Sequence, residues 1–168
     1  MRLTRYIKPP QVRLELNTRT PEQPIEGSRD RFVWGVKEAV IAELAELFDA
    51  SGRIVNRSKL ITDMCNRERK ATTAIGGGVA IPHVRTLQAR EFIMCFARST
   101  PGVEFDSDGP VHLFVGVVAP PYDDKLYLEV YRELARIFKS ERARETLMST
   151  GDAHEVVKIL SDFDSWGT

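Results

Sequence analysis

The strongest constraint on the fold is the segment VHLFVGVVA, residues 111–119, which is apolar almost throughout. A strand with one face in water alternates apolar and polar residues, whereas a strand covered on both faces does not. The segment EFIMCFARS, residues 91–99, is also apolar on both faces: Phe92, Met94 and Phe96 alternate with other apolar residues. Two such strands require a sheet with helices packed against each side.

Helical periodicity indicates where the covering helices lie. Apolar residues recur at helical spacing from about Val33, and Ser51-Gly52 is a typical helix end. A second helix is expected from about Arg57, with Asn56 or Ser58 as its N-cap. Further helices are expected over residues 125–139, 141–149 and 153–161.

The remaining segments predict an edge strand, a loop and a turn. Residues 12–16 (VRLEL) alternate in the manner of an edge strand. Residues 17–31 are rich in charge and proline, so we expect an exposed loop there. The residues PGVEFDSDGP, between the two apolar strands, have turn composition with Asp108-Gly109 at the centre. The fold class that we predict is a single-domain α/β protein, residues 1–168, with a mixed central sheet and helices on both faces.

The stretch TAIGGGVAIPHVRT, residues 73–86, brings a histidine to the end of a buried strand. Three glycines, 76–78, permit a backbone that a residue with a Cβ follows only at a cost. Residues 79–81 read as a short buried strand. Pro82 restricts its own φ and keeps the preceding residue extended, so the imidazole of His83 reaches a rim in one orientation.

Two common phosphate-binding motifs are excluded at this stretch. No Gly-Lys-Ser/Thr follows the glycines, so it is not a Walker loop, and the glycine spacing differs from the dinucleotide fingerprint. A single histidine after a strand is more often a surface residue than a nucleophile. The function of His83 therefore depends on the pattern as a whole.

The longer stretch reads NRERKATTAIGGGVAIPH. It resembles the histidine-containing segment of the type-2 enzyme IIA domains of the bacterial phosphoenolpyruvate-dependent sugar phosphotransferase system, the mannitol, fructose and nitrogen-regulatory group. Members typically show Arg-Glu, a few residues, then Thr-x-Ile-Gly-x-Gly-x-Ala-x-Pro-His. The match has no gap, and the residues in register are Arg67, Glu68, Thr73, Ile75, Gly76, Gly78, Ala80, Pro82 and His83.

The resemblance implies roles for these residues. His83 is the phosphoryl acceptor through Nε2, and a neighbouring group, a backbone carbonyl by expectation, holds Nδ1. Arg67 is the first candidate to bind the phosphoryl oxygens, because its guanidinium offers a bidentate fork. The Thr73 hydroxyl is a second candidate, although Thr72 and Thr73 equally suit the role of loop caps. The loop amides that we also predict to bind the phosphoryl group are those of Gly76, Gly77 and Gly78.

The chain departs from the family pattern at two positions. Val84 follows the histidine where members usually have glycine, which restricts the backbone there. The second histidine of the family falls on Tyr127 in this chain, counting back from the helical segment ELARIF. A phenol donates a hydrogen bond but carries no positive charge at neutral pH, so onward transfer of the phosphoryl group is the step in question.

Composition limits the classes of partner, compartment and bound group that we expect for this chain. Lys plus Arg equal Asp plus Glu at 24 each, so no overall charge favours nucleic acid. No apolar run approaches the ~20 residues of a membrane helix. Cys65 and Cys95 read as reduced core thiols of a cytoplasmic protein. His112 reads as a core or edge residue and His154 as exposed, so we expect neither a metal nor a cofactor.

These features lead to one main hypothesis and its alternatives. We expect a phosphoryl carrier or regulatory protein that accepts a phosphoryl group from the phosphocarrier protein HPr on His83, in nitrogen regulation or sugar transport. A separate IIB protein or a regulated protein is a possible further partner. The alternative is a non-catalytic binding module on the same fold, which Val84 and Tyr127 favour. Arg67 and the intact GGGVAIPH favour transfer.

Overall fold

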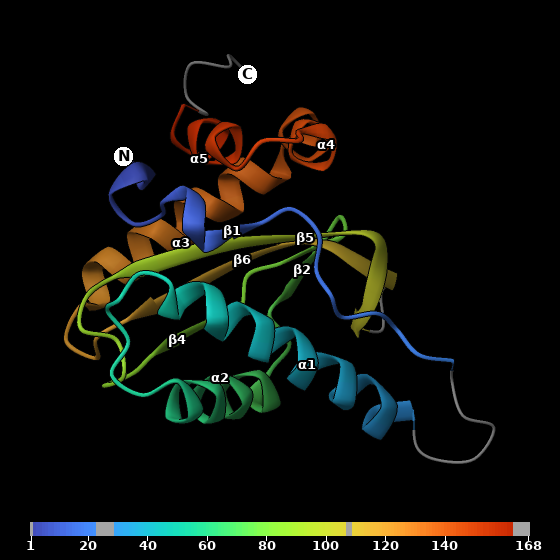
Figure 1. Cartoon of the computed structure of the whole chain (residues 1–168), viewed down its shortest axis with the longest axis horizontal. Helices are drawn as coiled ribbons and strands as arrows, with labels where there is room; N and C mark the ends of the chain where they lie inside the picture. The colour runs from blue at the N-terminus through green and yellow to red at the C-terminus, as the bar shows by residue number, and fades with distance from the viewer. Residues whose placement is uncertain (1, 23–28, 107–108, 163–168) are drawn as a thin grey trace.

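The computed structural model describes residues 2–22, 29–106 and 109–162. In this part of the chain a six-stranded sheet lies between two layers of helices (Figure 1). One face is covered by α1 (Arg29–Asp49) and α2 (Arg57–Lys70), and the other by α3 (Asp124–Lys139), α4 (Glu141–Ser149) and α5 (Ala153–Ser161). The predicted α/β class with helices on both faces is confirmed.

The sheet is mixed and is built around β6. Its strands are β1 (Val12–Arg13), β2 (Ala74–Gly76), β3 (Val79–Ala80), β4 (His83–Arg85), β5 (Ile93–Asp106) and β6 (Gly109–Ala119). The order is β1-β5-β6-β3-β2, and β4 also pairs with β6. Pairs β5–β6 and β2–β3 are antiparallel, whereas β1–β5, β3–β6 and β4–β6 are parallel.

The two central strands bury side chains on both faces, as their composition predicts. In β5, Cys95 packs with the α1 and α2 layer while Phe96 packs with the other helices. In β6, Phe114 and Val115 divide in the same way. Gly116 lets α1 approach closely, because a Cβ there would lie 2.6 Å from the Phe48 ring. Because side chains pack closely against both faces of β6, this strand and the segments paired with it have little freedom to shift.

Most predicted element boundaries are confirmed. Helix α2 begins after Asn56, whose side chain accepts a hydrogen bond from the Lys59 amide at 3.0 Å. Helices α4 and α5 occupy the predicted residues. The predicted edge strand is present as β1, but it is only two residues long, and Leu16 makes a further backbone bond to Arg98. Two short 3₁₀ turns, η1 (Leu3–Arg5) and η2 (Pro9–Gln11), precede it.

Two predictions on loops need correction. Residues 29–31 belong to α1, so the predicted loop 17–31 is wrong at its end, and residues 23–28 lie outside the described part of the chain. The predicted turn at 101–110 is also wrong over its first half, because β5 continues to Asp106 and pairs Val103 with Val111. Gly102, at φ +79°, lies in the irregular stretch of this strand. Asp108 is outside the described residues.

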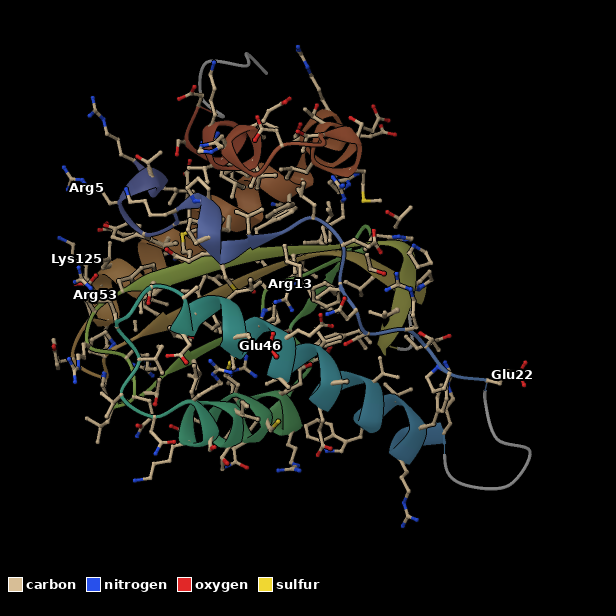
Figure 2. The ribbon with its side chains drawn as sticks, viewed as in Figure 1. Arg5, Arg13, Glu22, Glu46, Arg53 and Lys125 are labelled. Atoms are coloured by element: carbon tan, nitrogen blue, oxygen red, sulfur yellow. The ribbon has the colours of Figure 1, made fainter. Side chains whose placement is uncertain are left out.

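The segment that precedes residue 23 is held to α1 by the carboxylates of Glu43 and Glu46. Glu43 accepts hydrogen bonds from Arg13 at 3.0 Å and from the amides of Asn17 and Thr18 at 2.8 and 2.7 Å. Arg13 also pairs with Glu46 at 3.0 Å, across the space between β1 and α1 (Figure 2). Burial by itself raises the pKa of Glu43, but these hydrogen bonds outweigh it and the pKa is lowered. The carboxylate therefore stays charged and holds residues 17–18 to the helix.

Composition led to expectations about membrane-spanning helices and about the two cysteines, which the described residues allow us to examine. No helix among them is long and apolar enough to cross a membrane. Cys65 and Cys95 are both buried free thiols. Burial raises the pKa of both thiols, and an uncharged thiol in the core is unreactive.

Candidate functional site

His83 is positioned by the backbone on either side of it. The run from Val79 to Arg85 follows the edge of β6, first as β3 and then as β4, with Pro82 between the two pairings. The Pro82 carbonyl accepts a hydrogen bond from the Val117 amide at 2.9 Å. His83 itself is in register with Val117. The imidazole is therefore held to a strand whose position the core determines.

One ring nitrogen of His83 is held by the backbone. Nδ1 lies 2.6 Å from the Ile81 carbonyl oxygen. A carbonyl oxygen only accepts hydrogen bonds, so the proton of the neutral ring is on Nδ1 and the lone pair is on Nε2. The backbone carbonyl that the sequence led us to expect is that of Ile81.

Arg67 lies beside the free nitrogen. Its Nη2 is 3.4 Å from His83 Nε2, and its Nη1 donates to the Ala71 carbonyl at 3.0 Å. The side chain comes from the last turn of α2 and meets a histidine sixteen residues further along the chain. A guanidinium at this position can bind an anion carried by Nε2 through its second N–H group.

The surroundings keep His83 neutral. Burial is the largest effect and lowers the pKa of the imidazole. The hydrogen bond to Ile81 raises it, the charge of Arg67 lowers it, and the charge of Glu68 raises it. The net effect is a pKa below the ordinary value of 6.5, so the ring is unprotonated at Nε2 at neutral pH.

Two tyrosine rings lie against the imidazole. The centroid of the Tyr127 ring is 5.7 Å from that of His83, and the centroid of Tyr131 is 4.8 Å from it. Burial raises the pKa of Tyr127 to about 12, so its hydroxyl stays protonated and can donate a hydrogen bond. The sequence did not lead us to expect Tyr131 as a site residue. Its spacing of four residues from Tyr127 on the predicted helix was the signal that could have identified it.

His83 opens into a surface groove of about 940 Å³. Arg67, Lys70 and Arg85 contribute positive charge to its lining. Arg85 also pairs with Asp124 and lies over the Tyr127 ring, 5.7 Å from its centroid. The groove thus combines a neutral nucleophile with cations, which suits an anionic group.

The side chain of Thr73 is bound by Glu68. Thr73 is buried, and its hydroxyl donates to Glu68 at 2.6 Å. Its carbonyl accepts a hydrogen bond from the Ile81 amide at 2.9 Å. The hydroxyl that we expected to bind a phosphoryl oxygen is therefore engaged elsewhere.

The glycines are likewise separated from the imidazole. Gly76, Gly77 and Gly78 all have positive φ, which confirms the need for glycine, and they form the turn between β2 and β3. The Gly78 carbonyl accepts from the His112 amide at 2.8 Å, at the start of the buried part of β6. Because His83 pairs five residues further along β6, the turn lies at the other end of this run. Its expected amide contacts with a phosphoryl group are not formed by this geometry.

The other histidines lie apart from the groove. His112 Nδ1 is 3.0 Å from the Ser99 carbonyl, and the ring packs against Gly102. His154 is exposed in the first turn of α5. Among the described residues no cluster of three or more His, Cys, Asp or Glu side chains could hold a metal ion.

The chain is similar to known proteins along most of its length. The family described as "Phosphoenolpyruvate-dependent sugar phosphotransferase system, EIIA 2" matches residues 33–163. The PTS system fructose-specific EIIA component of Haloferax volcanii is 30% identical over 128 residues, 75% of this chain and 83% of that protein. The fructose-specific EIIABC component of Bacillus subtilis is 31% identical over 130 residues, 76% of this chain, but the chain spans only 20% of that protein. The crystal structure of nitrogen regulatory protein IIA-Ntr from Neisseria meningitidis superimposes with a TM-score of 0.76 at 25% identity, covering 94% of this chain and 98% of that one.

The pKa of His83 offers a direct check on this geometry. We expect Arg67→Gln to raise it, because the substitution removes a positive charge beside Nε2. Arg69→Gln is the matched control, since Arg69 is exposed on the same helix and stacks on Trp34 instead. NMR titration of the His83 ring measures both variants. An unchanged pKa in Arg67→Gln would place the guanidinium away from the ring.

Proposed function

The chain belongs to the EIIA 2 family of the phosphoenolpyruvate-dependent sugar phosphotransferase system, and on that premise we propose that it accepts a phosphoryl group from phospho-HPr on Nε2 of His83. Proteins of this family are phosphoryl carriers. The observation that supports His83 most directly is the pair of contacts on its ring. Nδ1 donates to the Ile81 carbonyl at 2.6 Å, and Arg67 lies 3.4 Å from Nε2.

The proposed reaction needs little covalent chemistry from the protein. The Nε2 lone pair of His83 attacks phosphorus and forms a new N–P bond. The P–N bond to the histidine of HPr breaks, and its electron pair stays on the HPr imidazole. Positive charge develops on the His83 ring, whose Nδ1–H then donates more strongly to the Ile81 carbonyl. Arg67 binds the phosphoryl oxygens. The Ile81 contact is already formed before transfer and Arg67 already lies beside Nε2, so little reorganisation accompanies the step.

The two departures from the family pattern have different consequences. Val84 is 9% exposed and packs in the core under α1 and α2. None of the described non-glycine residues has a positive φ, so valine fits this backbone without strain. Tyr127 is a neutral donor where the family resemblance places a histidine, so it offers the phosphoryl group less stabilisation than a cation would. The valine therefore supplies no argument for a non-catalytic module, and the tyrosine is the remaining one.

The partners follow from the proposed step. The donor is HPr, and the acceptor, if onward transfer occurs, is a separate IIB protein. The relatives include fructose-specific components and nitrogen regulatory proteins, so a regulated protein that reads the phosphorylation state is the second candidate partner. Both roles use the same phosphohistidine, and we place them in the cytoplasm with HPr.

His83 is expected to be the only phosphorylated histidine. Incubation with phospho-HPr, followed by mapping of acid-labile phosphohistidine, should label His83. His83→Ala should abolish labelling, whereas His112→Ala and His154→Ala should keep it, because neither residue lies in the groove. Labelling that persists in His83→Ala would refute the assignment.

Arg67→Lys is expected to slow phosphoryl acceptance. Lysine keeps the charge but loses the planar fork, so the rate should fall roughly ten- to a thousand-fold, the range for losing one donor to a transition state. Arg69→Lys, on the same helix but stacked on Trp34, serves as the control and should keep the wild-type rate. Single-turnover kinetics with phospho-HPr measures both. A large drop in melting temperature with an unaltered rate would make Arg67 structural instead.

The contribution of Tyr127 should be smaller. A neutral hydrogen-bond donor contributes about 1 kcal/mol net, so Tyr127→Phe should weaken phosphorylation only several-fold. Tyr127→His restores a family-like pair and is expected to speed onward transfer to a IIB acceptor. Tyr122→Phe is the control, because that side chain is 82% exposed. Equal phosphorylation of wild type and Tyr127→Phe would remove the hydroxyl from the site.

A further inference from the structure

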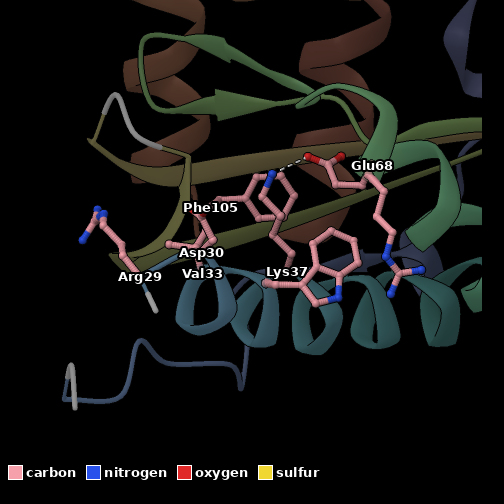
Figure 3. A pocket seen from close by; sticks show the side chains of 8 residues that line it. Arg29, Asp30, Val33, Lys37, Glu68 and Phe105 are labelled. Atoms are coloured by element: carbon pink, nitrogen blue, oxygen red, sulfur yellow. Dashed lines mark hydrogen bonds and ion pairs between the residues drawn. The ribbon is translucent and has the colours of Figure 1, made fainter. Parts of the chain in front are cut away.

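A buried ion pair joins α2, the helix that carries Arg67, to α1. Glu68 follows Arg67 on α2, and its side chain is 1% exposed. Its Oε1 is 2.8 Å from Nζ of Lys37 on α1, whose side chain is 11% exposed (Figure 3). Lys37 also lies over the Phe105 ring, 4.9 Å from its centroid. The pair lines a hollow of about 490 Å³ that shares no lining residue with the His83 groove.

Hydrogen bonds converge on the Glu68 carboxylate from the turn after α2. Oε1 accepts from the Thr73 amide at 3.1 Å in addition to Lys37, and Oε2 accepts from the Thr73 hydroxyl at 2.6 Å. A buried ion pair is weak evidence for stability, because apolar residues of similar volume are often as good or better. Stability alone therefore does not account for this arrangement.

The turn that Glu68 holds leads to Arg67. Ala71, the C-cap of α2, is extended, and its carbonyl accepts from Arg67 Nη1 at 3.0 Å. Two residues later the chain is held by both carboxylate oxygens of Glu68. The hydrogen bonds from Thr73 to Glu68 fix the chain just after α2. The position of the Ala71 carbonyl, and of the guanidinium that donates to it, therefore depends on them.

The same turn leads to His83. The Thr73 carbonyl accepts from the Ile81 amide at 2.9 Å. The Ile81 carbonyl in turn holds His83 Nδ1 at 2.6 Å. One carboxylate thus reaches the nucleophile through three hydrogen bonds and the phosphoryl-binding arginine through two.

We infer that Glu68, held by Lys37, is a positioning residue that sets Arg67 and His83 against each other for phosphoryl transfer. It does not touch the phosphoryl group. This inference rests on the proposed function for its rate effect, but its effect on the His83 ring exists without any transfer.

The test compares three variants. Glu68→Gln leaves the Lys37 ammonium buried without its carboxylate. The new amide NH₂ also faces Lys37 and Thr73, which are themselves hydrogen-bond donors. The double variant Lys37→Met with Glu68→Leu removes the ion pair altogether, so that packing compensates the loss of stability. Glu43→Gln is the matched control on α1, because Glu43 is also mostly buried and also holds backbone amides, but those of residues 17–18.

Two measurements are made on each variant. The first is the tautomer of His83 in the unphosphorylated protein, from ¹⁵N chemical shifts of the ring. The second is single-turnover acceptance from phospho-HPr, separated into a rate constant and a half-saturating concentration. Melting temperatures record stability alongside them.

Glu68→Gln and the double variant are expected to show a mixture of Nδ1–H and Nε2–H tautomers. Their rate constant should fall about 10- to 100-fold, the scale of a misplacement of about 1 Å, with the half-saturating concentration nearly unchanged. Glu43→Gln should lose stability but keep the wild-type tautomer and rate. A double variant that regains its melting temperature together with a single Nδ1–H tautomer and the wild-type rate would overturn the inference, because Glu68 would then act on stability alone. If wild type accepts no phosphoryl group, the proposed function fails, and the tautomer measurement by itself decides the role of Glu68.

Discussion

The site depends on the pairing of one short chain segment with β6. Residues 79–80 and 83–85 both pair in parallel with this strand, whose side chains are buried on both faces. Val79 and Ala80 pack in the core on opposite faces of the sheet, so moving the segment by one residue would exchange the faces of its side chains, and the register is strongly specified. The position of His83 at the edge of the groove is therefore a consequence of core packing.

The chemistry of the site arises from small adjustments to this frame. Pro82 lies between the two paired stretches, and the Ile81 carbonyl meets Nδ1 of His83, two residues further along the chain. That single hydrogen bond selects the tautomer with its lone pair on Nε2. Burial and Arg67 then keep the ring unprotonated at neutral pH. Together these effects leave the lone pair of Nε2 available.

Residues outside the groove support those within it. The sequence motif pairs Arg67 with Glu68, and the structure gives the two neighbours opposite directions. The arginine faces the groove, whereas the glutamate points into the core toward Lys37. Thr73, which the motif places near the histidine, belongs with the glutamate: its hydroxyl and amide contact the carboxylate. A short motif can thus contain both the reacting groups and the groups that position them.

The sequence alone determined the layered α/β fold and most of the helix boundaries, because hydrophobic periodicity and capping are local signals. The gapless motif also singled out His83 and Arg67 as site candidates, and the structure places these two side chains next to each other. Tertiary structure alone decided the rest. The extension of β5 to Asp106 depends on pairing with β6, which outweighs the local turn composition. The glycine turn is near His83 in sequence but not in the site, because Gly78 bonds to β6 at His112, five residues before the residue opposite His83. Thr73 lies opposite Ile81 across the hairpin, but its side chain contacts Glu68. Tyr131 lies four residues after Tyr127, which is a local signal, but it reaches the imidazole only because α3 packs against the sheet.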